Sequence, residues 1–380
     1  MSNWNDYLAW RGDLTFDQCP LQPVDALLMA SVSYLHFGDN ARGEGCYLRD
    51  AAPVVQPLPD ANASQQRWYE LLQTMAKTRR FSMVVAHQYE METVPEEQKQ
   101  FSAITFRLPN DEEIVCFRGT DNSMVGWRED FLMSAQSPVP AQLSAVHYLN
   151  ARARSTPGRV YVAGHSKGGN LAMYAAIHST RDTVDKLTAI YNFDGPGLNE
   201  QSLKSEHYHL VSPLIHSFVP QDSVVGMLMH VQPSLTAVHS THIGIWQHDA
   251  FSWEILGSDF VTLPAVHASS LALGNSVRAF LDSQDTEHRL LLVNTLFDLL
   301  EASGSTTLRA PSGERIRQAQ AAIAALGDLD AETRKTFWAM VKNFASLMAG
   351  ETADMIRSTL PESLRDLEGG IRGIFGINNE

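Results

Sequence analysis

Residues 160–172 read Val160-Tyr161-Val162-Ala163-Gly164-His165-Ser166-Lys167-Gly168-Gly169-Asn170-Leu171-Ala172, and this stretch decides the fold. A β-branched and aromatic run leads into Gly-x-Ser-x-Gly and then into small, helix-forming residues, which predicts a strand, a sharp turn and a helix. Such a turn lifts the hydroxyl of Ser166 clear of the sheet and points the amide N–H of Lys167 at the same space. The alternative, a glycine-rich turn whose serine only caps the helix, explains the glycines but not the features described below.

Length and composition are those of an ordinary globular protein. The 380 residues suffice for one large α/β domain and a smaller appendage. Hydrophobic residues make up 44% and charged residues 19% of the chain. The net charge of −14 and the pI near 5.4 argue against nucleic-acid binding, which needs a basic face. An acidic surface also disfavours purely electrostatic docking on anionic membranes.

The chain carries no visible targeting or disulfide signal. The first seven residues lack the basic and apolar regions of a secretion signal. No apolar stretch is long enough to cross a bilayer, so we expect no integral membrane segment. Three cysteines are too few for a disulfide framework, and Cys116 fits a buried position in an apolar strand. These features predict a cytoplasmic protein and leave its oligomeric state open.

Strand-like and helix-like segments alternate along most of the chain, which is typical of an α/β fold with a mostly parallel sheet. Acidic turn residues at 109–112 predict a hairpin between two of the strands. The expected strands are 81–86, 101–108, 113–117, 160–163, 187–193, 215–220 and 243–246, and the clearest helices are 22–29, 68–72 and 170–179.

The pattern changes at about residue 285. Apolar residues then recur at helical spacing through 290–300, 323–326 and 337–347. We therefore predict an α/β domain over 1–284 and an all-helical extension or cap over 285–380.

A serine becomes a useful nucleophile only when an imidazole takes its proton and an acid orients that imidazole. In a wound α/β hydrolase these residues follow in the order serine, acid, histidine, each after a strand. The chain has 14 histidines, so one histidine alone means little. His248 follows the last strand-like run and is the predicted base, with His239 and His242 as alternatives. His165 precedes the serine and is given a packing or hydrogen-bonding role.

Three aspartates compete for the role of the acid. Asp222 follows the strand predicted over 215–220 and is favoured. Asp194 also ends a strand, but it precedes Gly-Pro-Gly and is explained more simply as a turn former. Asp249 is adjacent to the predicted base and would have difficulty reaching around to its ring.

The negative oxygen of an acyl-transfer intermediate needs two donors. The turn supplies the N–H of Lys167. Phe117-Arg118-Gly119-Thr120 ends an earlier strand, and there Thr120 can offer both its N–H and its hydroxyl. The His-Glu-x-x-His spacing of a metal site does not occur, so we predict no metal and no cofactor.

Four motifs together resemble the class 3, fungal-type lipases: Phe117-Arg118-Gly119-Thr120, Gly164-His165-Ser166-Lys167-Gly168-Gly169, Asp194-Gly195-Pro196-Gly197 and Asp222-Ser223-Val224. Residues 118–131 and 247–253 are more similar still to a bacterial Mbeg-like branch. The resemblance covers about residues 10–270 and implies an α/β-hydrolase fold. It also implies a triad of Ser166, Asp222 and His248, with Thr120 and Lys167 as the oxyanion hole.

The residue after the serine departs from the lipases, and the segment at 123–131 extends the likeness. Lys167 stands where true lipases usually have leucine, which predicts a charge beside the substrate mouth. By the same likeness residues 123–131 lead towards a lid, but Trp127 and Phe131 at helical spacing favour a place in a core.

The sequence thus predicts a serine hydrolase that cleaves carboxylic esters through an acyl-serine intermediate. A small-molecule acyl ester or lipid is the expected substrate, although a fold does not determine a substrate. A thioesterase or amidase would use the same groups. The alternative is a non-catalytic binding or scaffold protein whose C-terminal helices recruit a partner.

Overall fold

The computed structural model describes residues 3–55, 63–121, 123–230, 234–302, 331 and 333–337. The chain forms two compact units, one of residues 1–119 and 140–270 and one of residues 120–139 and 271–380. The predicted division was at 284/285. In the structure the second unit begins at residue 271 and also includes residues 120–139 from the middle of the chain.

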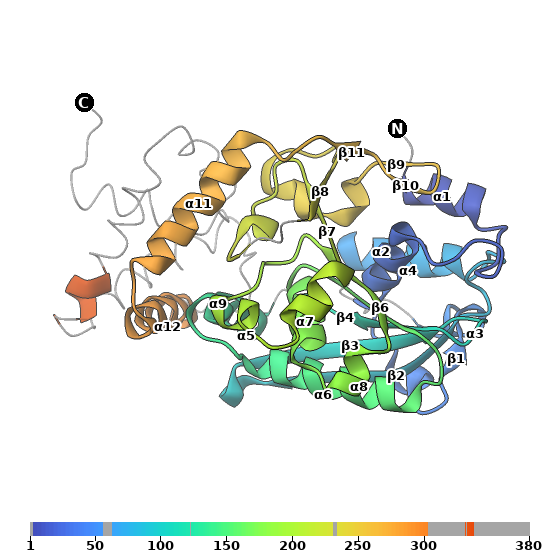
Figure 1. Cartoon of the computed structure of the whole chain (residues 1–380), viewed down its shortest axis with the longest axis horizontal. Coiled ribbons are helices and arrows are strands. Elements are labelled where there is room, and N and C mark those ends of the chain that lie inside the picture. The colour runs from blue at the N-terminus through green and yellow to red at the C-terminus, as the bar shows by residue number, and fades with distance from the viewer. Residues whose placement is uncertain are drawn as a thin grey trace. The chain divides into compact units, whose positions relative to one another are not determined.

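A nine-stranded sheet runs through the first unit in the order β1-β2-β3-β4-β5-β6-β7-β8-β11 (Figure 1). The central strands β4 to β8 pair in parallel, and the pairs on either side are antiparallel. A separate antiparallel pair is formed by β9 and β10. The strands are β1 (Cys46–Tyr47), β2 (Val85–Val94), β3 (Lys99–Arg107), β4 (Glu113–Phe117), β5 (Val160–His165), β6 (Leu187–Phe193), β7 (Ile215–Pro220), β8 (Leu235–Val238), β9 (Ile255–Leu256), β10 (Asp259–Phe260) and β11 (Thr262–Leu263).

Helices cover both faces of this sheet, which explains why its central strands are apolar throughout. In β4, Ile114 and Cys116 join a core with the helix α2, whereas Val115 and Phe117 join a second core with α6 and α7. Successive side chains of a strand point to opposite faces, so a strand buried on both faces shows a continuous apolar run. The predicted α/β class is confirmed.

The helices of the first unit range from 4 to 16 residues in length. They are α1 (Trp4–Arg11), α2 (Pro23–Val32), α3 (Leu48–Ala51), α4 (Ala63–Met75), α6 (Pro140–Ser155), α7 (Lys167–His178), α8 (Arg181–Val184), α9 (Glu200–Leu203) and α10 (Tyr208–Val211), with 3-10 turns η1 (Gly38–Ala41), η2 (Pro95–Glu97), η3 (Ser212–Leu214), η4 (Val225–Met227), η5 (Gly244–His248) and η6 (Ala250–Ser252).

Most predicted strands are confirmed, and two differ. The predicted strands at 187–193 and 215–220 coincide with β6 and β7, and β3 and β4 form the predicted hairpin. The strand predicted from residue 81 begins only at Val85. The strand predicted at 243–246 is wrong. Gly244 has φ 56, which breaks an extended chain, and Ile243 and Trp246 are 80% and 59% exposed.

The described part of the second unit is helical. Its helices are α5 (Met124–Ala135), α12 (Thr286–Ala302) and most of α11 (Ala268–Asp282). The Phe131 and Phe297 rings meet at 5.5 Å, and Trp127 packs on the same apolar cluster. Arg128 donates to Asn294 at 2.9 Å. Trp127 thus has the predicted place in a core, whereas Phe131 is 39% exposed and meets the cluster only through its contact with Phe297. Of the predicted helical segments, 323–326 and the part of 337–347 that follows Phe337 lie outside the described residues.

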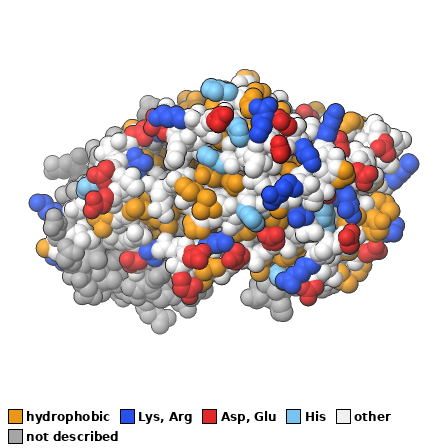
Figure 2. Space-filling model, turned by 60° about the horizontal axis from the view of Figure 1, so that its bottom comes forward, with side chains coloured by type: hydrophobic (Ala, Val, Ile, Leu, Met, Phe, Trp, Pro, Cys, Tyr) orange, Lys and Arg blue, Asp and Glu red, His pale blue; other side chains and the backbone are white. Residues whose placement is uncertain are grey.

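Among the residues that the structure describes, no helix combines the length and the apolar character needed to cross a bilayer. Lys and Arg side chains are interspersed with Asp and Glu on the face of the molecule in Figure 2, although the whole chain has a net charge of −14. Hydrophobic side chains lie between them on that face, singly and in small groups.

Candidate active site

The predicted turn after β5 is present, with Ser166 at its apex. Ser166 has φ 59 and ψ −133, a backbone conformation that costs a non-glycine residue about 1–3 kcal/mol. The flanking glycines are needed for space. A Cβ on Gly164 would lie 2.1 Å from the carbonyl of Gly168, and one on Gly168 would lie 2.1 Å from the carbonyl oxygen of Phe117. The strand, turn and helix therefore meet as the motif predicts.

The next strand of the sheet delivers a carboxylate to the same place. His165 of β5 lies opposite Phe193 of β6, and the N–H of Ser166 donates to the carbonyl of Phe193 at 3.0 Å. The residues that follow, Ser166 and Asp194, consequently leave the sheet side by side. Asp194 also turns abruptly, with φ 49, and its N–H donates to the carbonyl of Phe218 at 2.8 Å.

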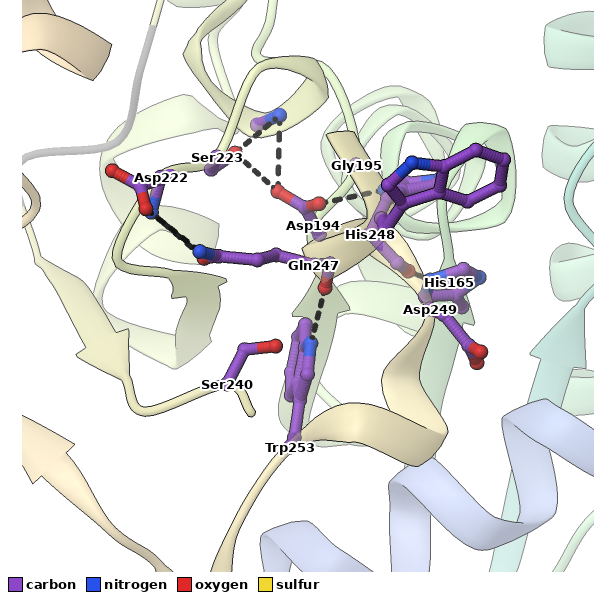
Figure 3. Close-up of polar contacts among 12 residues, drawn as sticks. His165, Asp194, Gly195, Asp222, Ser223, Ser240, Gln247, His248, Asp249 and Trp253 are labelled. Atoms are coloured by element: carbon purple, nitrogen blue, oxygen red, sulfur yellow. Dashed lines mark hydrogen bonds and ion pairs between the residues drawn. The ribbon is translucent and has the colours of Figure 1, made fainter. Parts of the chain in front are cut away.

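Asp194 and His248 are paired by a hydrogen bond (Figure 3). The Nδ1 atom of His248 lies 2.6 Å from Oδ2 of Asp194, which is fully buried. The other carboxylate oxygen accepts from Ser223 Oγ at 2.5 Å and from the N–H of Gly226 at 3.1 Å. Three donors thus hold the carboxylate, and the Nε2 atom of the imidazole remains for other chemistry.

The structure does not bring Asp222 to His248, so the predicted pair is corrected to His248 and Asp194. Oδ1 of Asp222 lies 2.7 Å from His267 Nδ1, and Oδ2 accepts from Gln247 Nε2 at 2.7 Å. The order of the strands explains the correction. Asp194 follows β6, which is adjacent to the serine strand, whereas Asp222 follows β7, one strand further away.

The rival candidates have other partners. His239 Nδ1 lies 2.9 Å from a carboxylate oxygen of Glu254, and His242 Nδ1 lies 3.1 Å from the carbonyl of Trp246. Asp249 pairs with Arg67 at 2.7 Å. His248 differs from His239 and His242 because its carboxylate partner, Asp194, ends the strand next to the serine turn.

His165 holds the loop of His248 by hydrogen bonding, the role predicted for it. Its Nε2 donates to the backbone carbonyl of His248 at 2.8 Å, and its Nδ1 accepts from the hydroxyl of Tyr34 at 3.1 Å. Tyr34 in turn stacks on Trp68 with ring centroids 4.3 Å apart. Burial, and then the nearby His248, lower the pKa of His165 to about 4. His165 is therefore neutral near pH 7 and adds no positive charge beside His248.

The predicted oxyanion donors have different surroundings. A Cβ on Gly119 would lie 3.1 Å from Cβ of Ser166, so the end of β4 reaches the serine turn itself. Thr120 begins the second unit, where its hydroxyl donates to Asp130. The backbone N–H of Lys167 opens α7 directly after the serine. The oxyanion role of Lys167 and Thr120 stays a prediction.

The predicted charge of Lys167 at the substrate mouth is wrong. Its side chain is buried, and Nζ donates to the backbone carbonyl of Gln100 at 2.9 Å. The long side chain thus reaches β3 and is directed away from solvent.

Sequence reasoning missed three polar side chains that support the site: Ser223, Gln247 and His267. Ser223 and Gln247 each adjoin a candidate residue along the chain, which was the available signal, but nothing in the sequence tells which carboxylate they would meet. In the described part of the chain, no group of three or more His, Cys, Asp or Glu side chains is placed to hold a metal ion.

The sheet order, the serine turn between β5 and α7, and the histidine–aspartate pair at the ends of the strands define an α/β-hydrolase fold. The chain belongs to the Mbeg1-like family, whose family model matches residues 75–298. The resemblance to the Mbeg-like branch is thus confirmed.

Two solved lipase structures are similar at low identity. The M37 lipase is 12% identical, with a TM-score of 0.33, over 53% of this chain and 67% of that chain. A triacylglycerol lipase from Penicillium expansum is 12% identical, with a TM-score of 0.31, over 50% of this chain and 78% of that chain. No curated protein matches the sequence.

Proposed function

We propose that the protein is a serine hydrolase that cleaves carboxylic esters. One observation carries the proposal: a buried carboxylate, Asp194, lies 2.6 Å from the imidazole of His248 and leaves the sheet beside the strained Ser166. A carboxylate that holds the Nδ1 atom of a histidine leaves Nε2 to act as the base toward a serine hydroxyl. A serine that only caps a helix needs neither a strained backbone nor a neighbouring histidine–aspartate pair.

The proposed reaction has two halves. The oxygen of Ser166 attacks the ester carbonyl while His248 Nε2 takes its proton, and the oxyanion is held by the N–H groups of Lys167 and Thr120. The C–O bond of the ester then breaks, and His248 returns the proton to the departing alkoxide. In the second half, His248 takes a proton from water, the hydroxide attacks the acyl carbon, and Ser166 regains its proton as the carboxylic acid leaves.

A small acyl ester or lipid is the substrate class that we propose. Ile243 precedes the turn η5, which ends at His248, and Trp246 lies within it. These two side chains are 80% and 59% exposed. Exposed apolar side chains this close to the proposed base suit an acyl chain better than a charged peptide.

A fluorophosphonate probe tests the proposal directly, because it forms a stable bond with an activated serine. We expect the wild type to be labelled and Ser166→Ala not to be labelled. His248→Ala should lower both labelling and p-nitrophenyl ester turnover by about 10³–10⁴-fold with an unchanged circular dichroism spectrum, since the base is lost.

His209→Ala, at an exposed histidine outside the site, is the matched control and should react as the wild type does. Labelling that persists in Ser166→Ala, or a wild type that is not labelled, would contradict the proposal. A wild type that is not labelled would favour a binding or scaffold protein.

A further inference from the structure

We infer that Asp222 is a positioning residue rather than the acid of the triad. This inference rests on the proposed function. Together with Gln247, Asp222 holds the loop that carries His248, and its negative charge is not needed for the chemistry. Asp222, Gln247 and their contacts form what we term the 222–247 clamp.

The clamp is reciprocal. Gln247 Nε2 donates to Oδ2 of Asp222 at 2.7 Å, and Gln247 Oε1 accepts the backbone N–H of Asp222 at 2.9 Å (Figure 3). Gln247 is only 1% exposed, so these bonds satisfy polar groups that would otherwise be buried without partners. Because Gln247 immediately precedes His248, its position determines where the base enters the site.

The same short segment also holds the acid. Ser223, the residue after Asp222, donates its hydroxyl to the carboxylate of Asp194 at 2.5 Å. On the other side, Gln221 exchanges hydrogen bonds with the backbone of Ser240 at 2.7 and 3.0 Å. Residues 221–223 therefore bond to Asp194 through Ser223, and through Asp222 they bond to Gln247, the residue before His248.

The remaining oxygen of Asp222 has an exposed partner, His267. Oδ1 lies 2.7 Å from Nδ1 of His267, whose side chain is 59% exposed. The backbone N–H of His267 also donates to the carbonyl of Gln221 at 2.8 Å. Both oxygens of Asp222 thus serve neighbouring segments of the chain, and neither lies on His248.

Hydrogen bonds and charge make different demands on this position. An asparagine at 222 can turn its carbonyl oxygen to Gln247 Nε2 and its amide to the imidazole nitrogen of His267, so the clamp survives. Leucine is larger and its side chain has no polar atom, so the buried Nε2 of Gln247 loses its acceptor and only the bond from the backbone N–H of residue 222 to Gln247 Oε1 remains. At Asp194, asparagine removes the charge that stabilises the imidazolium.

The experiment measures kcat and KM for a p-nitrophenyl ester in Asp222→Asn, Asp222→Leu and Asp194→Asn. We expect Asp222→Asn to stay within about threefold of the wild type with the same pH profile. Asp222→Leu should lower kcat by about 10–100-fold with little change in KM, because the base is displaced. Asp194→Asn should lower kcat by about 10³–10⁴-fold.

Gln247→Leu is the second variant and guards against misfolding of Asp222→Leu. It should lower kcat as much as Asp222→Leu does, and the double variant should be no worse than either, since the two side chains act as one unit. An Asp222→Asn variant as inactive as Asp194→Asn would overturn the inference. Fully additive losses in the double variant would overturn it as well.

A structural readout separates this inference from the proposed function. The Nδ1 proton of His248, bonded to Asp194, should give a downfield proton resonance that His248→Gln removes. We expect the resonance to persist in Asp222→Asn and to shift or vanish in Asp222→Leu, whether or not the protein turns over an ester. If the wild type has no activity but these shifts occur, the proposed function fails and the clamp stands. An unshifted resonance in Asp222→Leu would refute the clamp.

Discussion

At the scale of single residues, two abrupt turns lie beside each other at the ends of the adjacent strands β5 and β6. Ser166 and Asp194 both have positive φ, 59 and 49, where side chains are disfavoured. The strain is stored where the proposed chemistry needs a hydroxyl and a carboxylate raised from the sheet. The turn-forming explanation of Asp194 was therefore right about its backbone, but it did not exclude a second role for the side chain.

His165 makes the stability of the protein depend on pH. Burial and then the nearby His248 lower its pKa to about 4, whereas an unfolded histidine titrates at about 6.5. Above the unfolded value both states are neutral and the full contribution of His165 is present. As the pH falls from there toward 4, the unfolded state takes up a proton that the native state refuses, so stability is lost.

We expect urea unfolding to show this loss. Between pH 7.5 and 4.5 the wild type should lose roughly 2–3 kcal/mol more of its free energy of unfolding than His165→Gln. His209→Gln, at an exposed position, should follow the wild type. Parallel curves for the wild type and His165→Gln would show that His165 titrates alike in both states.

At the scale of elements, the junction of β4, β5 and α7 works because glycine lets three backbones approach. A Cβ on Gly168 would lie 2.1 Å from the carbonyl oxygen of Phe117, an atom fixed in the sheet. The first turn of α7 therefore cannot move closer to β4 than it already is, and any added atom must push the helix away. The same approach sets the height of Ser166 above the sheet.

Gly168→Ala should accordingly destabilise the protein by about 3 kcal/mol or more and lower fluorophosphonate labelling, because backbone atoms must shift to admit the methyl group. Gly43→Ala is the control, since its Cβ would meet nothing within 4 Å and its φ of +56 costs only local strain of about 1–2 kcal/mol. Thermal or urea unfolding measures both variants. Equal costs for the two would mean that the junction is not tightly packed.

At the scale of the whole molecule, a buried ion pair joins the N-terminal region of the first unit to residue 80. Arg80 donates to both oxygens of Asp25 at 2.8 and 2.5 Å and to the carbonyl of Cys19 at 2.9 Å. The hydroxyl of Tyr7 donates to the same aspartate at 2.7 Å, and the guanidinium lies 4.1 Å from the ring centroid of Phe16. One side chain thus connects three segments of the N-terminal region to residue 80, whose neighbours lead into the sheet.

Arg80→Ala should cost about 3–5 kcal/mol in the free energy of unfolding, because it leaves the fully buried Asp25 without its counter-charge. The double variant Arg80→Leu with Asp25→Leu should be clearly more stable than Arg80→Ala, since no charge is then stranded. The exposed Arg181, which pairs with Asp185, is the matched control, and its replacement by alanine should cost less than about 1 kcal/mol. Equal costs at Arg80 and Arg181 would refute this account.

The sequence by itself determined the local features whose causes lie within a few residues. The turn at Ser166 follows from glycine spacing, and β6 and β7 follow from apolar runs that helices bury on both faces. Contacts between distant segments decided the rest. Asp194 and Asp222 both end strands, and only the order of β5, β6 and β7 places the first of them beside His248. Lys167 and the exposed Ile243 and Trp246 were misjudged for the same reason: burial depends on what the folded chain brings against a residue, and that is not written in its neighbours along the sequence.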